Sequence, residues 1–164
     1  MKKVIISLLV IGLFFTIFVN LEAEQISLER VIETPEMSKD ALFTLINLWF
    51  VDLARSAGIG TGIQFSEKES GIISGIYVNE NIRAVAGDHH IVTATVTIEV
   101  REGRYKISFT NPTWRFAKSS RTGVENPVIR GRALNNALAD KVVAEWEKEI
   151  SSLDFYIFNG SNSW

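Results

Sequence analysis

The most constraining feature of the sequence is strict alternation over residues 91–101. Apolar side chains occupy every second position, namely Val92, Ala94, Val96, Ile98 and Val100. Threonine and charged residues fill the positions between them. Successive side chains of a β-strand point to opposite faces, so the pattern predicts a strand with one face on a core and the other in water.

A hairpin is expected directly after this strand. Glu102 and Gly103 supply a two-residue turn, and residues 104–110 alternate again, with Tyr105, Ile107 and Phe109 facing the core. A second hairpin is expected upstream, with its turn at residues 68–71. The remaining strands are expected at residues 30–33, 63–65 and 72–78.

Two segments have the periodicity of amphipathic helices. The first has Ser38 as a suitable N-cap and Gly58 as its natural C-cap. The second begins near Asn135 or Asn136 and carries an apolar stripe over residues 139–153. The order of elements predicts an α+β domain: a single antiparallel sheet of about five strands with both helices on one face.

The first 23 residues are typical of a secretory signal peptide. Lys2 and Lys3 precede an uncharged stretch at residues 4–19. As a helix this stretch would span about 24 Å at roughly 1.5 Å per residue, short of the roughly 30 Å hydrocarbon core. Ala23 suits a cleavage site and Leu21 does not, so a cleaved signal and an uncleaved N-terminal membrane anchor both stay open. In either case the remainder is expected to be exported, in the periplasm or at the cell surface.

Composition narrows the chemistry of the expected domain at residues 24–160, which a loose tail at 161–164 follows. The chain has no cysteine, which excludes disulfides, thiolate metal sites and a cysteine nucleophile. Its net charge is −2 and becomes more negative without residues 1–23, so nucleic acid is not an expected partner. No cofactor or metal is expected.

Several segments resemble a bacterial exported domain family of unknown function with a TBP-like fold. They are residues 32–35, 38–43, 49–50, 68–75 and 96–106. The resemblance covers roughly residues 30–152. It implies a β-α-β-β-β-β-α layout and secreted or envelope proteins, and it supplies no activity or functional residues. Because fold does not determine function, the fold name does not imply DNA binding.

Two motifs are weak candidates for chemistry. Asp88, His89 and His90 resemble a phosphoesterase signature, but the further aspartates that such enzymes need are missing. Adjacent strand residues also point to opposite faces, so a solvated start of a strand is the simpler interpretation. The glycines at residues 58–62 follow a helix instead of opening one, which favours a helix cap and loop over a phosphate site.

A basic bias is the stronger functional indication. Residues 101–132 contain eight basic residues and two glutamates. Arg101, Arg104 and Lys106 share the expected open face of the sheet with threonines of the alternating strand. Such a face is suited to an anionic glycan, a lipid head group or an acidic protein, although a solvated face kept soluble by charge is the simpler alternative.

Pro112 raises a question about which way the following aromatic residues point. Counted straight on from Arg104, Trp114 and Phe116 would point outward beside arginines and form a binding anchor. Proline in a strand sits at edges or bulges, and a bulge would turn both aromatic side chains into the core. We expect the bulge. The candidate binding residues are Arg101, Arg104, Lys106, Trp114 and Arg115.

These observations favour a non-catalytic binding module for an envelope protein or an anionic envelope polymer. The alternative is a small envelope hydrolase with an unrecognised site, for which the vicinity of Asp88, His89 and His90 is the candidate. Any contact with the membrane is expected only through the N-terminal segment.

Overall fold

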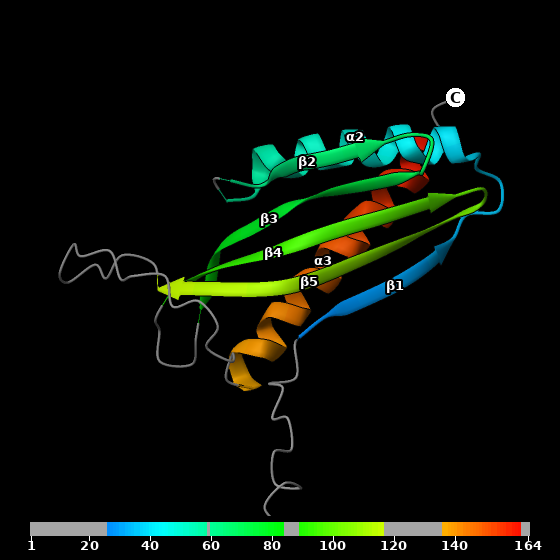
Figure 1. Ribbon diagram of the computed structural model, residues 1–164. Coiled ribbons are helices and arrows are strands. Elements are labelled where there is room, and N and C mark those ends of the chain that lie inside the picture. Colours follow the sequence, from blue (N-terminus) through cyan, green and yellow to red (C-terminus); the bar gives the residue numbers. More distant parts are fainter. Residues whose placement is uncertain (1–25, 59, 84–88, 117–135, 162–164) are drawn as a thin grey trace, which may run out of the picture.

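Five strands form one antiparallel sheet in the order β1-β5-β4-β3-β2 (Figure 1). The structure is a computed structural model that describes residues 26–58, 60–83, 89–116 and 136–161. Its elements are β1 (Leu28–Glu33), α2 (Lys39–Ser56), β2 (Gly62–Glu67), β3 (Ile72–Arg83), β4 (His89–Arg101), β5 (Arg104–Phe116) and α3 (Asn136–Ser161). The predicted α+β layout is confirmed.

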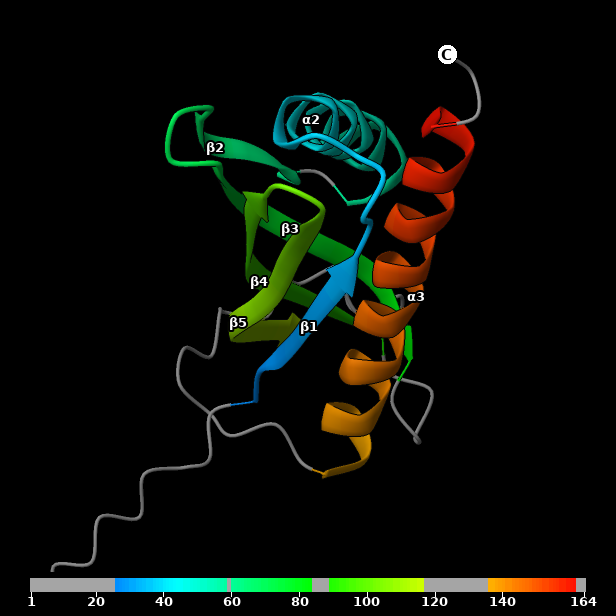
Figure 2. The same ribbon diagram turned by 90° about the vertical axis from the view of Figure 1, so that its right-hand side faces the viewer.

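Both helices pack on the same face of the sheet, as Figure 2 shows from the side. Phe109 of β5 stacks on Trp146 of α3 with ring centroids 5.1 Å apart. On the same face, Gly75 of β3 lies so close to Phe50 of α2 that an added Cβ would be 2.7 Å from the ring. The alternating apolar residues of β4 are buried between these contacts, so the core lies between the helices and this face.

The predicted start of α2 is confirmed and its predicted cap at the end is wrong. The Oγ of Ser38 accepts a hydrogen bond from the backbone N–H of Ala41. The C-cap is Ala57, in an extended conformation, and Gly58 has no positive φ. Gly58 is instead required by space, because an added Cβ would lie 2.6 Å from the Cγ of Glu80.

Helix α3 begins at Asn136, as expected, and continues past the predicted apolar stripe to Ser161. The helix therefore includes Ser161, the first residue of the expected loose tail. Gly160 permits a close approach of the two helices, because an added Cβ would lie 2.7 Å from Leu45 of α2. Tertiary packing extends the helix through a glycine that its local sequence disfavours.

The bulge that Pro112 predicts is present. Thr93 pairs with Thr113 and Thr95 pairs with Thr110, so β5 contains one more residue than β4 between these pairs. Asn111 within the bulge has a φ of 52°. Trp114 is consequently turned to the helix-covered face and is only 9% exposed. The side chain of Phe116 lies outside those that the structure describes.

The sequence of residues 79–90 allows either a polar loop or a fraying continuation of the strand, and the described part of it is strand. β3 reaches Arg83, and its pairing with β4 shifts by one residue between Asn79 and Ile82. His90 is buried, with its ring 5.2 Å from that of Trp114, whereas His89 is exposed. The interpretation of this motif as a solvated start of a strand is thus wrong for His90, because His90 lies two residues before Val92 and the alternation of β4 turns it to the core.

Some predictions fall outside the described residues: the signal or anchor at residues 1–23, Asp88, the basic residues between 117 and 132, and residues 162–164 of the expected tail. Within the described parts of the chain, no helix is both long enough and apolar enough to cross a membrane.

Candidate functional site: the open face of the sheet

The face of the sheet opposite the helices is called the open face here, since no described helix covers it. Strand pairing arranges its side chains in rows across the strands. One end row contains Arg101, Arg104 and, opposite Arg104 on β1, Glu33. The next row contains Glu67, Ile72, Glu99, Lys106 and Val31.

The centre of the open face is rich in hydroxyl groups. Its rows contain Ser74, Thr97 and Ser108, then Thr95 and Thr110, then Thr93 and Thr113. We call these seven residues the hydroxyl patch. Six of them are partly exposed and Thr113 is fully exposed. Phe65 of the edge strand β2 pairs with Ser74 at one border of the patch and is 50% exposed.

Arg101 and Arg104 face each other directly across the β4–β5 hairpin, and both are exposed. In the described part of the chain neither forms an ion pair. Like charges directly opposite on neighbouring strands are destabilising by roughly 0.2–1 kcal/mol. The pair therefore presents two cationic, bidentate donors whose repulsion an anion between them would relieve.

Lys106 differs from the arginine pair because acidic neighbours already neutralise it. Its Nζ lies 2.5 Å from the carboxylate of Glu99 and 3.7 Å from that of Glu29. The hydrogen bond to Glu99 is the main cause that raises the pKa of Lys106, and Arg101 nearby acts in the opposite direction. Lys106 therefore stays protonated and contributes less net positive field than its charge suggests.

A shallow depression of about 250 Å³ lies at this end of the open face. It is lined by Val31, Glu99, Arg101, Arg104, Tyr105 and Lys106. Val31 comes from the edge strand β1 and is 56% exposed. The depression thus offers one apolar wall beside the arginine pair, enough for one small group of a larger ligand.

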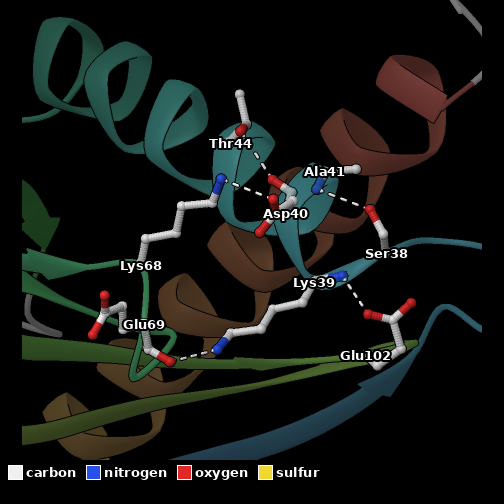
Figure 3. Close-up of polar contacts among 8 residues, drawn as sticks. All are labelled: Ser38, Lys39, Asp40, Ala41, Thr44, Lys68, Glu69 and Glu102. Atoms are coloured by element: carbon white, nitrogen blue, oxygen red, sulfur yellow. Dashed lines mark hydrogen bonds and ion pairs between the residues drawn. The ribbon is translucent and has the colours of Figure 1, made fainter.

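The hairpin that carries the arginines is fixed from the other side by the start of α2 (Figure 3). The backbone N–H of Lys39 donates to Glu102 at 2.9 Å, and its ammonium donates to the carbonyl of Glu69 at 2.6 Å. Lys68 and Asp40 form an ion pair at 2.9 Å. These contacts join the two hairpin turns to the helix terminus.

Backbone hydrogen bonds reinforce the same corner. Val100 N–H donates to the carbonyl of Gly71 at 2.7 Å, and Gly103 exchanges hydrogen bonds with Thr34 and Met37. The arginine pair is therefore presented by a rigid turn, so that binding orders little backbone.

The structure brings together three of the five candidate binding residues. Arg101, Arg104 and Lys106 line one depression. Arg115 is exposed on the open face, where it pairs with Ile91, but it lies on the order of 30 Å from Arg104 along the strand. Trp114 is buried on the helix side, so its assignment as an exposed anchor is wrong.

Sequence reasoning missed Val31 and Glu99 as neighbours of the arginines. Glu99 was visible in the alternation of β4, two residues before Arg101. Val31 could not be found in this way, because it meets Lys106 only through the pairing of β1 with β5. That pairing joins the first and the last strand of the chain and has no local signal.

The described residues offer little that resembles a catalytic centre. Among them, no group of three or more histidine and acidic side chains is placed to hold a metal ion. Two acidic side chains accept hydrogen bonds from the hydroxyl groups of buried tyrosines. Tyr77 donates to Glu149 at 3.1 Å, and Tyr105 donates to Asp154. Burial is the main cause that raises the pKa of both tyrosines, and these carboxylates raise it further.

Solved structures of bacterial proteins share this architecture. A DUF4468 family protein from Bacteroides ovatus superposes with a TM-score of 0.61 at 15% identity, covering 81% of this chain and 86% of that chain. A TBP-like protein from Parabacteroides distasonis gives a TM-score of 0.61 at 16% identity, covering 82% and 94%. At such identity the likeness establishes the fold alone. No curated protein matches the chain.

The fold class is therefore that of TBP-like α+β domains. The family model described as a domain of unknown function (DUF4468) with TBP-like fold matches residues 29–115. This is more than half of the chain, and the chain belongs to that family. The match ends within β5, so it includes the arginine hairpin and the hydroxyl patch.

Proposed function

We propose that this protein is a non-catalytic binding module of the cell envelope. Its partner is an envelope protein or polymer, and an anionic group of that partner docks between Arg101 and Arg104. The observation that carries the proposal is the arginine pair itself: two exposed guanidinium groups face each other without an ion pair in the described residues.

The surroundings of the pair support binding over a purely solubilising role. Glu99 and Glu29 lie close enough to neutralise Lys106. On the next row Glu33 stands opposite Arg104, yet neither arginine forms an ion pair within the described residues. A surface charge that only keeps a sheet soluble has no need to be paired with a like charge across a hairpin. The depression and the rigid turn add shape and preorganisation.

The export half of the proposal rests on residues 1–23, whose charged start and uncharged stretch are typical of a signal peptide or anchor. The partner is accordingly sought in the envelope. Fractionation of cells that produce the tagged full chain tests this half, and recovery of the protein in the cytoplasmic fraction would contradict it.

Crosslinking in cells that produce the full chain tests the binding half. The site variant Arg101→Glu/Arg104→Glu is compared with Arg55→Glu/Lys148→Glu, which makes the same charge change on exposed helix positions. We expect the wild type and the helix variant to form the same crosslinked species and the site variant to lose it. A species that all three proteins form equally would refute the assignment of the arginine pair.

A further inference from the structure

We infer that the partner is an anionic polysaccharide, bound along the open face over the hydroxyl patch as far as the arginine pair, with Phe65 beside it. The inference rests on the proposed function and deepens it by naming the chemical class of the ligand. Its basis is a juxtaposition on one face: a partly exposed hydroxyl patch has an exposed aromatic ring at one border, and two arginines without an ion pair in the described residues lie two rows beyond its end.

The hydroxyl patch is the first reason to prefer a polyhydroxylated ligand. Ser74 and Ser108 already donate to backbone carbonyls of β4, and Ser74 also contacts the hydroxyl of Thr97 at 3.3 Å. Thr93, Thr95, Thr110 and Thr113 make no side-chain hydrogen bond within the described part of the chain. Each hydroxyl is both donor and acceptor, so these four match the donors and acceptors of sugar hydroxyls.

The spacing of the patch suits an extended polymer. Neighbouring strands are about 4.8 Å apart, and side chains on one face of a strand recur about every 6.6 Å. A chain of pyranose rings that runs along β4 and β5 thus meets a new row of side chains about every 6.6 Å. From Thr93 and Thr113 to the arginine pair the path spans four row spacings, on the order of 26 Å, and Phe65 lies beside it, two strand spacings from β4.

Phe65 supplies the aromatic surface that sugar recognition requires. Its ring stands on the open face of an edge strand, half exposed, where nothing in the described core needs it. The apolar C–H face of a sugar packs on such a ring while its hydroxyls bond to the neighbouring row. A phenylalanine kept in water at this position is otherwise an aggregation hazard on an edge strand.

A protein partner fits this face less well. Protein interfaces concentrate their energy in a buried cluster of aromatic and apolar anchors at the centre, with a polar rim. Here the order is reversed, because the centre is hydroxylated and the aromatic ring and cations lie at its borders. The apolar side chains of the central rows are Ile76, which is partly covered, and Val78, which is buried.

The arginine pair makes the ligand anionic. Each guanidinium can bind a carboxylate or a phosphate through two parallel hydrogen bonds. Both groups occur on polysaccharides, as uronic acids or as phosphate substituents, and the geometry of the pair accepts either. Two probes therefore separate these sources: an oligouronate and a phosphorylated oligosaccharide of similar length.

The experiment measures binding of labelled probes to the full chain, purified as the cell produces it. The charged probes are joined by a neutral dextran oligosaccharide and by oligoglutamate, which carries carboxylates without sugar hydroxyls. The variants are Phe65→Ala, the near-isosteric Thr95→Val/Thr110→Val, and Arg101→Gln/Arg104→Gln. Phe155→Ala is the matched control, since Phe155 is 69% exposed on α3.

We expect at least one charged saccharide to bind more tightly than dextran and oligoglutamate. Phe65→Ala and Thr95→Val/Thr110→Val should each weaken its binding about tenfold, which corresponds to about 1.4 kcal/mol. Phe155→Ala should leave it unchanged, and the arginine variant should abolish it. The preferred probe then identifies carboxylate or phosphate as the anion.

Two adverse results are distinguishable. If oligoglutamate binds as tightly as the saccharides and depends on the arginines alone, the polysaccharide inference falls while the proposed anion site stands. If no charged probe responds to the arginine variant, both fall. Thermal unfolding of each variant confirms that a lost signal reflects the site, because all the substituted side chains are at the surface.

Discussion

Gly71, in the turn between β2 and β3, and Gly103, in the turn between β4 and β5, have the same backbone conformation but different surroundings. Gly71 has a φ of 73° and Gly103 a φ of 67°, both in the left-handed region. A Cβ added to Gly71 would lie 2.3 Å from the backbone oxygen of Val100. At Gly103 the nearest atom would be the Cα of Pro35, at 3.5 Å, which is an ordinary contact.

The expected cost of an alanine follows from these two contributions. The left-handed conformation costs an L-residue roughly 1–2 kcal/mol and applies to Gly71→Ala and Gly103→Ala alike. Only Gly71→Ala must also displace the carbonyl oxygen of Val100. The backbone N–H of the same residue donates a hydrogen bond to the carbonyl of Gly71 at 2.7 Å. Overpacking of this kind costs roughly 1–3 kcal/mol, so Gly71→Ala should destabilise by about 2–5 kcal/mol.

Asparagine variants separate the two contributions. Asparagine tolerates the left-handed region, so Gly103→Asn should cost little, whereas Gly71→Asn still places a Cβ against Val100. The free energy of unfolding is measured by urea denaturation. An unchanged slope m checks that each variant exposes the same surface on unfolding as the wild type. Equal losses for the two alanine variants, or a neutral Gly71→Asn, would refute the steric argument.

Three further predictions concern the core, a helix terminus and pH. Trp146→Ala should lose roughly 3–5 kcal/mol, because Trp146 is fully buried against Phe109; chemical denaturation measures the loss, and a loss below 1 kcal/mol would contradict the packing. Ser38→Ala should cost about 1 kcal/mol in the same assay by removing the N-cap of α2, and unchanged stability would mean that the cap is dispensable. The pKa values of Tyr77 and Tyr105 are raised in the folded protein, so the unfolded chain loses these protons at a lower pH than the folded one. The free energy of unfolding is therefore unaffected by these groups below about pH 10 and falls above it. The expected slope is up to about 1.4 kcal/mol per pH unit for each tyrosine. Unfolding measured from pH 9 to 11 should show a smaller decline in Tyr77→Phe than in the wild type, and an identical decline would count against a buried Tyr77.

Features with a local physical cause were predictable from the sequence. The alternation in β4 determines which side chains face the core, and Ser38 determines where α2 begins. Pro112 also predicted the bulge in β5, because a residue without an N–H interrupts the pairing pattern of a strand. From these elements the sheet, its two faces and the position of the arginine pair follow.

Features that depend on distant contacts were not predictable. Gly58 looked like a helix cap, yet its lack of a side chain serves the close approach of Glu80. Gly160 disfavours a helix locally, yet it lies in α3, where Leu45 packs against it. The burial of His90 is different, because it follows from the alternation of β4 once the strand is extended back to His89.

The candidate site divides in the same way. Arg101, Arg104 and Lys106 follow from alternation across one hairpin. The row order that places Phe65 beside the hydroxyl patch depends on the pairing of four strands, including the register shift between Ile63 and Phe65. Without that shift, Phe65 would point toward the helices.

The strand order also has a consequence for how the chain folds as it emerges. β1 is the first strand in the chain, yet it pairs only with β5, where Leu28 is the partner of Phe109. Hairpins β3–β4 and β4–β5 close over short loops and can form early, whereas closing the long loop to β1 carries a larger entropic cost. A chain that appears N-terminus first, from a ribosome or through a membrane pore, therefore keeps its first strand unpaired until most of the sheet has followed. The last edge of the sheet to be completed is the one that borders the arginine hairpin.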